Sequence, residues 1–101
     1  MNDEQKNSKQ MNIKKNIYLR KIGDEHIMVT QTGEKLNYSR VISLNESAAF
    51  LVEQSGNNEF TVTQWATLLM NKYGIDRKQA CLDAQALIDA LKDAGVIEND
   101  E

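Results

Sequence analysis

YSRVISLNESAAFLVEQSG, residues 38–56, contains the point at which the period of the hydrophobic pattern changes from two to 3.6. Its first seven residues centre on Val41 and Ile42, and a short β-branched run of this kind predicts a strand. From residue 45 onward, apolar side chains recur at helical spacing until Gly56, and glycine commonly ends a helix. The stretch therefore predicts a strand that leads directly into a helix.

Two further extended segments precede this stretch. Residues 17–22 and 26–30 are short runs rich in β-branched side chains, and Gly23 lies in the three-residue connection between them, which fits a hairpin. In the second run, Ile27 and Val29 fall on one face of the strand. We expect a three-stranded antiparallel sheet. Nothing in the sequence covers both edges of so small a sheet, so one edge is expected to stay free.

Three helices are predicted, each with a start signal and a closing glycine. Capping-box spacing occurs at residues 43–46, where Asn45 is an alternative cap, and again at 61–64, while Asp76 offers the cap of the last helix. The apolar stripes of the three helices are formed by Ala48, Leu51, Val52 and Ser55, by Val62, Trp65, Ala66, Leu69 and Tyr73, and by Ala80, Ala84, Leu87, Leu91 and Ala94. Val96 and Ile97 are expected to fold back onto the core.

The order of elements is therefore three strands followed by three helices, an α+β fold with the helices segregated from a small antiparallel sheet. Residues 1–10 contain no strong hydrophobe after Met1, so we expect a disordered tail over residues 1–11, with Met11 as an alternative start of the ordered part. One domain is predicted over residues 12–98, with a short C-terminal tail over 99–101.

The composition favours one soluble globular domain. The chain has 101 residues, of which 41% are hydrophobic, and no apolar run approaches the roughly 18 residues that a membrane span needs. The N-terminal segment lacks the apolar centre of a signal peptide. The single cysteine, Cys81, cannot form an internal disulfide, which fits a reducing compartment. We expect a cytoplasmic protein without membrane contact.

Charge is distributed unevenly along the chain, and this disfavours nucleic-acid binding. Residues 1–40 carry eight basic and five acidic side chains, whereas residues 41–101 carry four basic and ten acidic ones. A DNA-recognition helix should be basic, but the last helix has Arg77, Lys78 and Lys92 against four aspartates. A winged-helix DNA-binding protein is therefore an alternative of lower rank, as is a structural subunit of a larger enzyme.

Side chains suited to catalysis are scarce. His26 is the only histidine and lies next to a predicted turn, and Cys81 lies at the margin of an apolar helix face. One histidine and one cysteine are too few for a zinc site. Asp83, Asp89 and Asp93 are spread around their helix, and the glycines occur singly, so no phosphate-binding loop is predicted. We expect no catalytic residue, no metal and no cofactor, and thus no independent enzyme activity.

Two motifs resemble those of the PqqD family. The first is LNESAAF at residues 44–50, and the second is ACLDAQALIDAL at residues 80–91, which runs on to Gly95. Together with the hairpin and the link that starts at Gly56, they resemble pyrroloquinoline-quinone synthesis protein D and the related recognition elements for ribosomally made, post-translationally modified peptides. The resemblance covers roughly residues 12–97.

This resemblance implies a winged-helix-like fold and a mechanism. The leader segment of a precursor peptide would add as an extra strand beside the third strand and lie against the third helix, for delivery to a modifying enzyme, often a radical-SAM protein. Carried onto this sequence, it implies that the peptide contacts Ser39, Arg40, Val41, Ile42, Ser43, Asp83, Ala84, Leu87 and Ile88.

The residue pattern refines that expected site. Strand alternation predicts that only one of Val41 and Ile42 points inward. Cys81 and Ile88 lie toward one edge of the last helix's apolar stripe, which makes both of them candidates for a peptide groove. Leu82 lies nearly opposite the stripe and indicates an oligomer or enzyme contact.

Strand addition is also plausible on physical grounds alone. An exposed edge strand presents a row of unpaired N–H and C=O groups that an incoming peptide can satisfy. Four to six new hydrogen bonds at about 0.5–1.5 kcal/mol each give only a few kcal/mol, and ordering of the peptide opposes binding. Side chains in the groove must supply the remainder, and a dissociation constant near micromolar, about −8 kcal/mol, is expected.

Overall fold

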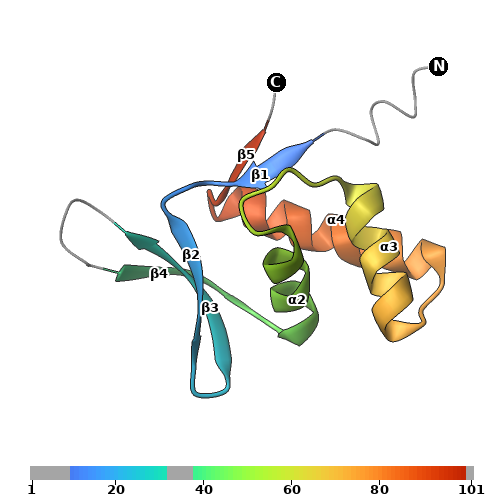
Figure 1. Cartoon of the computed structure of the whole chain (residues 1–101), viewed down its shortest axis with the longest axis horizontal. Coiled ribbons are helices and arrows are strands. Elements are labelled where there is room, and N and C mark those ends of the chain that lie inside the picture. Colours follow the sequence, from blue (N-terminus) through green and yellow to red (C-terminus); the bar gives the residue numbers. More distant parts are fainter. Residues whose placement is uncertain (1–9, 32–37, 100–101) are drawn as a thin grey trace.

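The computed structural model describes residues 10–31 and 38–99, so the predicted tail over residues 1–9 lies outside the described part. In chain order the elements are β1 (Met11–Ile13), β2 (Ile17–Ile22), β3 (Glu25–Gln31), β4 (Tyr38–Leu44), α2 (Glu46–Ser55), α3 (Val62–Tyr73), α4 (Arg77–Asp93) and β5 (Ile97–Asn99) (Figure 1).

Strands β2, β3 and β4 form an antiparallel sheet in the order of the sequence. Ile22 pairs with Glu25, so the hairpin loop has two residues and not the predicted three. Gly23 occupies the first position of this loop with a φ of 61°, a conformation that glycine adopts without steric cost. Helices α2, α3 and α4 follow the sheet, which confirms the predicted α+β fold.

The helix starts match the capping signals of the sequence. Of the two alternatives for α2, Asn45 is the cap, and its side chain accepts a hydrogen bond from the amide of Ala48 at 2.8 Å. At α3, Thr61 and Gln64 form a reciprocal capping box. Asp76 caps α4 by accepting from the amide of Gln79 at 2.8 Å. These bonds satisfy backbone donors that a bare helix end would leave unpaired.

A second, two-stranded sheet was not predicted from the sequence. β1 pairs antiparallel with β5, and the register joins Met11 to Asn99 and Ile13 to Ile97. The Met11 side chain is only 2% exposed, so Met11 belongs to the ordered domain. The paired strands thus begin one residue before and end one residue after the domain predicted over residues 12–98. Strands of three residues are too short to show an alternating pattern in the sequence.

The hydrophobic core lies between the helices and one face of the larger sheet. Met28 of β3 is fully buried there together with Trp65 of α3. The Trp65 indole N–H donates to the Ser55 hydroxyl at 2.7 Å, and the ring stacks on Phe60 with centroids 4.0 Å apart. Val96 is also fully buried, as the predicted return of the C-terminal segment to the core requires.

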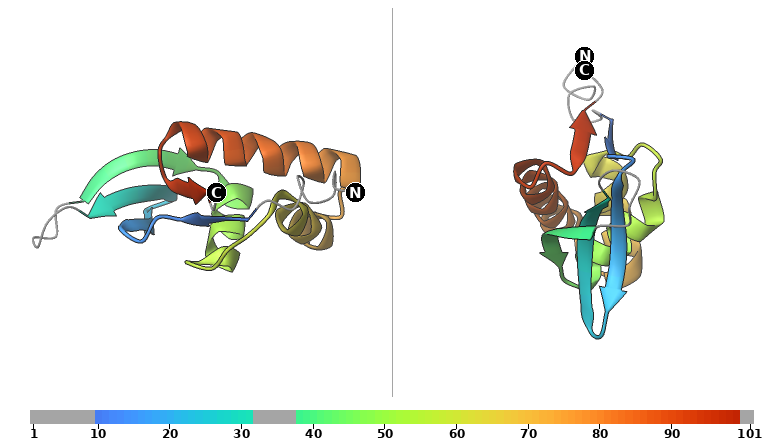
Figure 2. Two further views of the ribbon diagram at one scale, coloured as in Figure 1. Left: turned by 90° about the horizontal axis from the view of Figure 1, so that it is seen from above. Right: turned by 90° about the vertical axis from the view of Figure 1, so that its left-hand side faces the viewer.

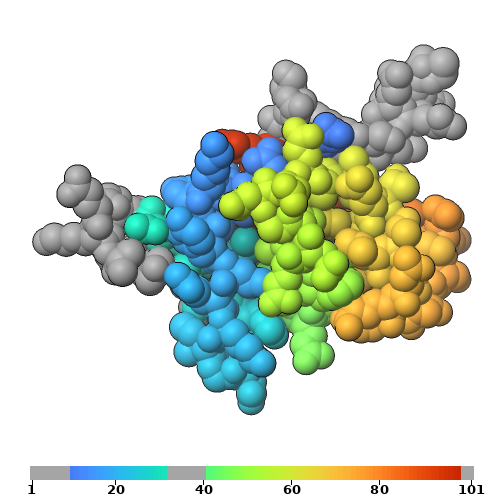
Figure 3. All heavy atoms as spheres, viewed as in Figure 1, coloured from blue at the N-terminus to red at the C-terminus, as the bar shows by residue number. Residues whose placement is uncertain are grey.

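Helix α4 runs along one side of the molecule, next to β4 at one flank and to the β1–β5 ribbon at the other (Figure 2). The opposite face of the molecule is formed mainly by β2, α2 and α3 (Figure 3). Because α4 has 17 residues, at about 1.5 Å per residue it spans roughly 25 Å.

Candidate functional site

Strand β4 is an edge strand, because the strand order of the sheet is β2-β3-β4. In the part of the chain that the structure describes, no strand pairs with its second side. Backbone groups on such a side have no ladder partner and can accept another extended chain. The free edge lies on the side of the molecule along which α4 runs (Figure 2).

A β-bulge in β4 changes which side chains point inward. Met28 pairs with Ile42 and Val29 pairs with Arg40, so Val41 is an extra residue without a partner in β3. Both Val41 and Ile42 are half-buried and pack against the core. The prediction that only one of them points inward is therefore wrong, because it assumed regular alternation through the bulge.

The other predicted positions of β4 continue its register along β3. Ser39 pairs with Thr30, and Ser43 pairs with Ile27 near the end of the strand. The Ser43 side chain is exposed. All five predicted strand positions thus lie on the edge strand itself.

A cavity of about 420 Å³ lies between α2, α3 and α4, and its lining begins at Asn45, the residue directly after β4. Leu51, Leu69 and Leu87 supply apolar surface in it. Its polar groups come from the start of α2 and from Asp83 of α4, whose carboxylate accepts a hydrogen bond from the Gln79 side chain at 2.8 Å. The complete described lining is Asn45, Ser47, Ala48, Leu51, Leu69, Asp83, Ala86 and Leu87.

Two of the predicted helix residues therefore lie in this cavity beside the edge strand. Asp83 is exposed and Leu87 is half-buried. Leu87 thus combines contact with the core and access from outside. This combination suits a side chain that binds an apolar group of a ligand.

Ala84 and Ile88 are core residues. Both are 0% exposed, because they lie on the face of α4 that points into the domain. The sequence pattern placed Leu87 in the centre of the apolar stripe and Ile88 at its edge, and the structure reverses these two positions. Neither Ala84 nor Ile88 lines the cavity beside β4, so their part in the site is to hold α4 in place.

Cys81 lies on the other flank of α4, away from Asp83 and Leu87. It is half-buried and lines a separate cavity of about 640 Å³ between α4, α3 and β1. Successive residues of a helix are rotated by about 100°, so residues 81 and 83 point about 160° apart, to nearly opposite sides. Cys81 and Leu87 therefore do not belong to one groove.

Sequence reasoning missed the contribution of α2 to the cavity beside β4. Asn45, Ser47 and Leu51 line it, and the first two belong to the LNESAAF motif. In the sequence, the motif indicates a helix start and resembles the PqqD family, but neither feature predicts that it lines a cavity. Its position at the strand-to-helix junction was the available signal, because the first turn of α2 must lie at the end of β4.

The described residues do not form a metal site. Within residues 10–31 and 38–99 there is no group of three or more histidine, cysteine, aspartate or glutamate side chains that could hold a metal ion. His26 lies on β3 and Cys81 on α4, in different parts of the fold. No helix in the same ranges is long and apolar enough to cross a membrane.

Comparison with solved structures places the fold. The chain superposes on "Lasso peptide synthetase B1 complexed with the leader peptide" with a TM-score of 0.61 and 22% sequence identity. The match covers 87% of this chain and 96% of that chain. At this identity the likeness establishes a shared fold. A search of curated proteins finds no match.

Comparison with family models gives the relationship. The model of "Coenzyme PQQ synthesis protein D (PqqD)" matches residues 25–97, from the start of β3 to the start of β5. The matched range includes β4 and all three helices, and it is more than two thirds of the 101 residues. The chain therefore belongs to the PqqD family.

Proposed function

We propose that this protein captures the leader segment of a ribosomally made precursor peptide and presents it to a modifying enzyme. The observation that carries the proposal is the free edge of β4, which ends at a cavity between α2 and α4. Membership of the PqqD family supports it. The shared fold with a synthetase component that was solved with a leader peptide supports it as well.

The peptide binds as a fourth strand of the sheet, next to β4. Its backbone pairs with β4, and one of its apolar side chains enters the cavity beside Leu51 and Leu87. Full burial of one such side chain contributes about 1.5–3 kcal/mol. With a few kcal/mol from backbone pairing and the opposing cost of ordering the peptide, affinity lies near the micromolar range.

The polar groups of the cavity set a preference for the neighbouring peptide residues. Asn45 and Ser47 offer amide and hydroxyl groups, and Asp83 offers a carboxylate. A carboxylate on the rim favours peptide side chains that donate hydrogen bonds or carry positive charge, and it disfavours acidic ones. We infer a leader with an apolar anchor flanked by a neutral or basic residue.

The chemical step belongs to the partner enzyme in this proposal. The cavity beside β4 is built from groups suited to holding a peptide, and its one titratable lining group in the described part is Asp83. A single carboxylate does not supply the acid, base and nucleophile that convergent catalysis needs. We infer a non-catalytic module that acts in the cytoplasm, where the free thiol of Cys81 stays reduced.

DNA binding is not favoured by the surface of α4. The exposed residues of this helix include Asp83, Asp89 and Asp93, which balance the charges of Arg77, Lys78 and Lys92, so the helix has no basic excess of the kind that a recognition helix carries. Carboxylates on a helix that enters a groove would repel the phosphate backbone.

Chemical-shift mapping with a leader peptide tests the function. The uniformly labelled protein is titrated with the leader segment of a precursor encoded beside its gene. We expect the largest shifts along β4 and at Asp83 and Leu87, together with cross-peaks between peptide and β4 backbone protons. Shifts confined to other elements, or a peptide that binds without pairing to β4, would contradict the proposal.

A further inference from the structure

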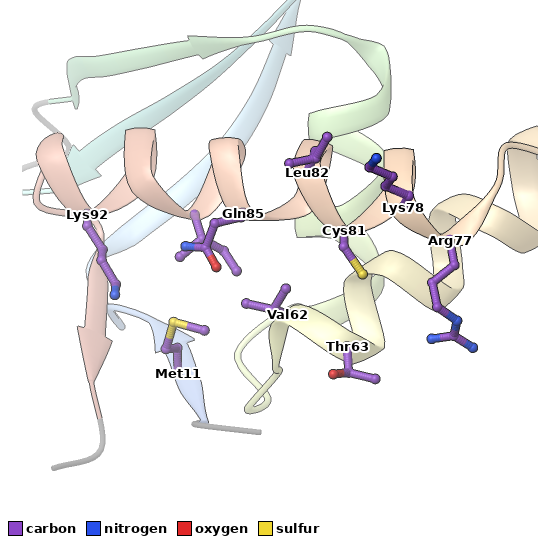
Figure 4. Close-up of a pocket in the computed structure, with 10 residues that line it drawn as sticks. Met11, Val62, Thr63, Arg77, Lys78, Cys81, Leu82, Gln85 and Lys92 are labelled. Carbon is purple, nitrogen blue, oxygen red and sulfur yellow. The ribbon is translucent and has the colours of Figure 1, made fainter. Parts of the chain in front are cut away.

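A second cavity lies on the flank of α4 that faces away from β4. It has a volume of about 640 Å³ and lies between α4, the start of α3 and β1 (Figure 4). Val62, Met11 and Leu82 contribute apolar surface, and the Leu82 side chain is 58% exposed. Single apolar side chains at a surface are ordinary, but here several of them line one hollow.

The charged groups at this cavity all have the same sign. Arg77, Lys78 and Lys92 line it, and no carboxylate is among its described lining residues. This is notable in a chain whose net charge is −3. Asp89, which is not among the lining residues, accepts a hydrogen bond from the Gln85 side chain at 2.9 Å. The cavity therefore presents apolar surface between cations.

The spacing of the cations defines the length of a ligand. Arg77 and Lys78 lie at the start of α4, and Lys92 lies in its last turn. Lys92 lies fourteen positions after Lys78 in the helix, which corresponds to about 21 Å. An extended peptide of about six residues covers this distance at roughly 3.3 Å per residue. Figure 4 shows Lys92 and Arg77 at opposite ends of the cavity, with Gln85 and Cys81 between them.

We propose that this cavity docks an acidic segment of the modifying enzyme, with carboxylates at both ends and an apolar side chain between them. The proposal rests on the proposed function, because a module that delivers a peptide must hold its enzyme and its peptide at the same time. The two cavities lie on different flanks of α4, with no described lining residue in common. A strand on β4 therefore leaves the basic cavity open.

A nucleic acid fits this cavity less well than an acidic peptide. A single strand carries a negative charge at every nucleotide, so some of its phosphates would lie over the apolar and neutral middle of the cavity, away from the lysines. A peptide can place its carboxylates only at the two ends, next to Lys78 and Lys92. The arrangement of the cations therefore favours a ligand whose negative charges lie only at its two ends.

Three synthetic probes test the chemistry of the cavity. The labelled full-length protein is titrated with acetylated Glu-Glu-Leu-Leu-Glu-Glu amide, with the corresponding Lys-Lys-Leu-Leu-Lys-Lys peptide, and with a twelve-nucleotide oligothymidylate. The acidic peptide is expected to shift the amides of Thr63, Cys81 and Gln85, and the basic peptide is not. Tighter binding of the oligonucleotide, or equal binding of both peptides, would overturn the proposal.

Paired charge reversals give the matched control. The Lys78→Glu, Lys92→Glu double variant should weaken binding of the acidic peptide at least about tenfold, because it reverses a cation at each end. The Lys21→Glu, Lys72→Glu variant makes the same change in net charge at exposed residues outside the cavity. The affinity of this control variant for the acidic peptide should stay within about twofold of that of the unchanged protein, since distant surface charges are screened by salt. An equal loss of affinity for the acidic peptide in both variants would show that net charge alone governs binding, and it would overturn the proposal.

The modifying enzyme encoded beside the gene provides the decisive measurement. With the protein saturated by leader peptide, its affinity for this enzyme is measured for both double variants. A loss of enzyme affinity only in the Lys78→Glu, Lys92→Glu variant, with its leader affinity unchanged, supports the proposal. Unchanged enzyme affinity overturns it and leaves the peptide function intact. Loss of leader binding at β4 would instead count against the proposed function itself.

Discussion

Leu87 is the residue on which the proposed peptide site depends most. It is half-buried against the core and borders the cavity beside β4. We expect Leu87→Glu to weaken leader binding at least about tenfold, because it replaces apolar contact by a charge next to Asp83. Isothermal titration calorimetry measures the change.

The control for this variant is Ile22→Glu, an equivalent substitution at a side chain that is 60% exposed at the hairpin. Leader affinity should stay within about twofold in this variant, since surface changes away from a site have small effects. Circular dichroism must show an unchanged fold for both proteins. An equal loss of affinity in the two variants would remove Leu87 from the site.

Ile88 stabilises the core of the domain, although it lies next to Leu87 in the sequence. Its side chain is 0% exposed, so Ile88→Ala removes buried carbon atoms and leaves a cavity. We expect a loss of about 2–5 kcal/mol in the free energy of unfolding. Leu82→Ala, at a largely exposed position, should change it by less than about 0.5 kcal/mol. Urea denaturation distinguishes these outcomes, and similar values for both would contradict the placement of Ile88.

Residue by residue, the sequence predicted most of the core and only part of the site. Trp65, Ala84 and Leu91 lie where helical periodicity placed them. Leu87 and Ile88 were exchanged, because neighbouring residues differ by about 100° around a helix and the stripe has a width similar to that angle. Which edge of a stripe is buried depends on the neighbouring helix, and that is a property of the tertiary structure.

At the scale of elements, β4 makes a prediction about the backbone of the ligand. If the leader pairs with its free edge, only every second peptide N–H points toward β4. N-methylation of one set of alternating residues should therefore weaken binding at least about tenfold, since it removes donors and adds bulk. Methylation of the other set should have a small effect. Fluorescence anisotropy with the two methylated peptides measures this, and equal behaviour of both would exclude strand addition.

The elements themselves were largely predictable, since their signals are local. Asn45, Thr61 and Asp76 all cap the helices to which the sequence assigned them. The bulge at Val41 was not predictable, because it depends on how β4 aligns with β3, and only the pairing reveals it. The contribution of α2 to the cavity beside β4 was missed because the cavity arises where α2, α3 and α4 meet, which is a property of the tertiary structure.

At the scale of the whole molecule, the β1–β5 ribbon connects the two ends of the domain to its core. Met11 and Ile13 are each 2% exposed, and the Met11 amide donates to the Phe60 carbonyl at 2.9 Å. Loss of two buried side chains at about 1.5–3 kcal/mol each approaches the total stability of a small domain. We expect removal of residues 1–13 to unfold the protein or to lower its melting temperature strongly.

Removal of residues 1–10 is the matched control for that truncation. It leaves β1 intact, so both the melting temperature and leader affinity should stay close to those of the full chain, with affinity within about twofold. Thermal denaturation and calorimetry on the two truncated proteins measure the difference. A large loss of leader affinity in the shorter truncation would make the first residues part of the binding site.

The pairing of Met11 with Asn99 also has a consequence for how this domain can be joined to other proteins. Both ends of the described domain lie at the antiparallel β1–β5 ribbon, while the free edge of β4 lies elsewhere (Figure 1). A host enzyme opened at a single surface loop could receive the whole unit there, as domains with adjacent ends tolerate insertion. Such a fusion would place the peptide-binding module and the modifying enzyme in one polypeptide.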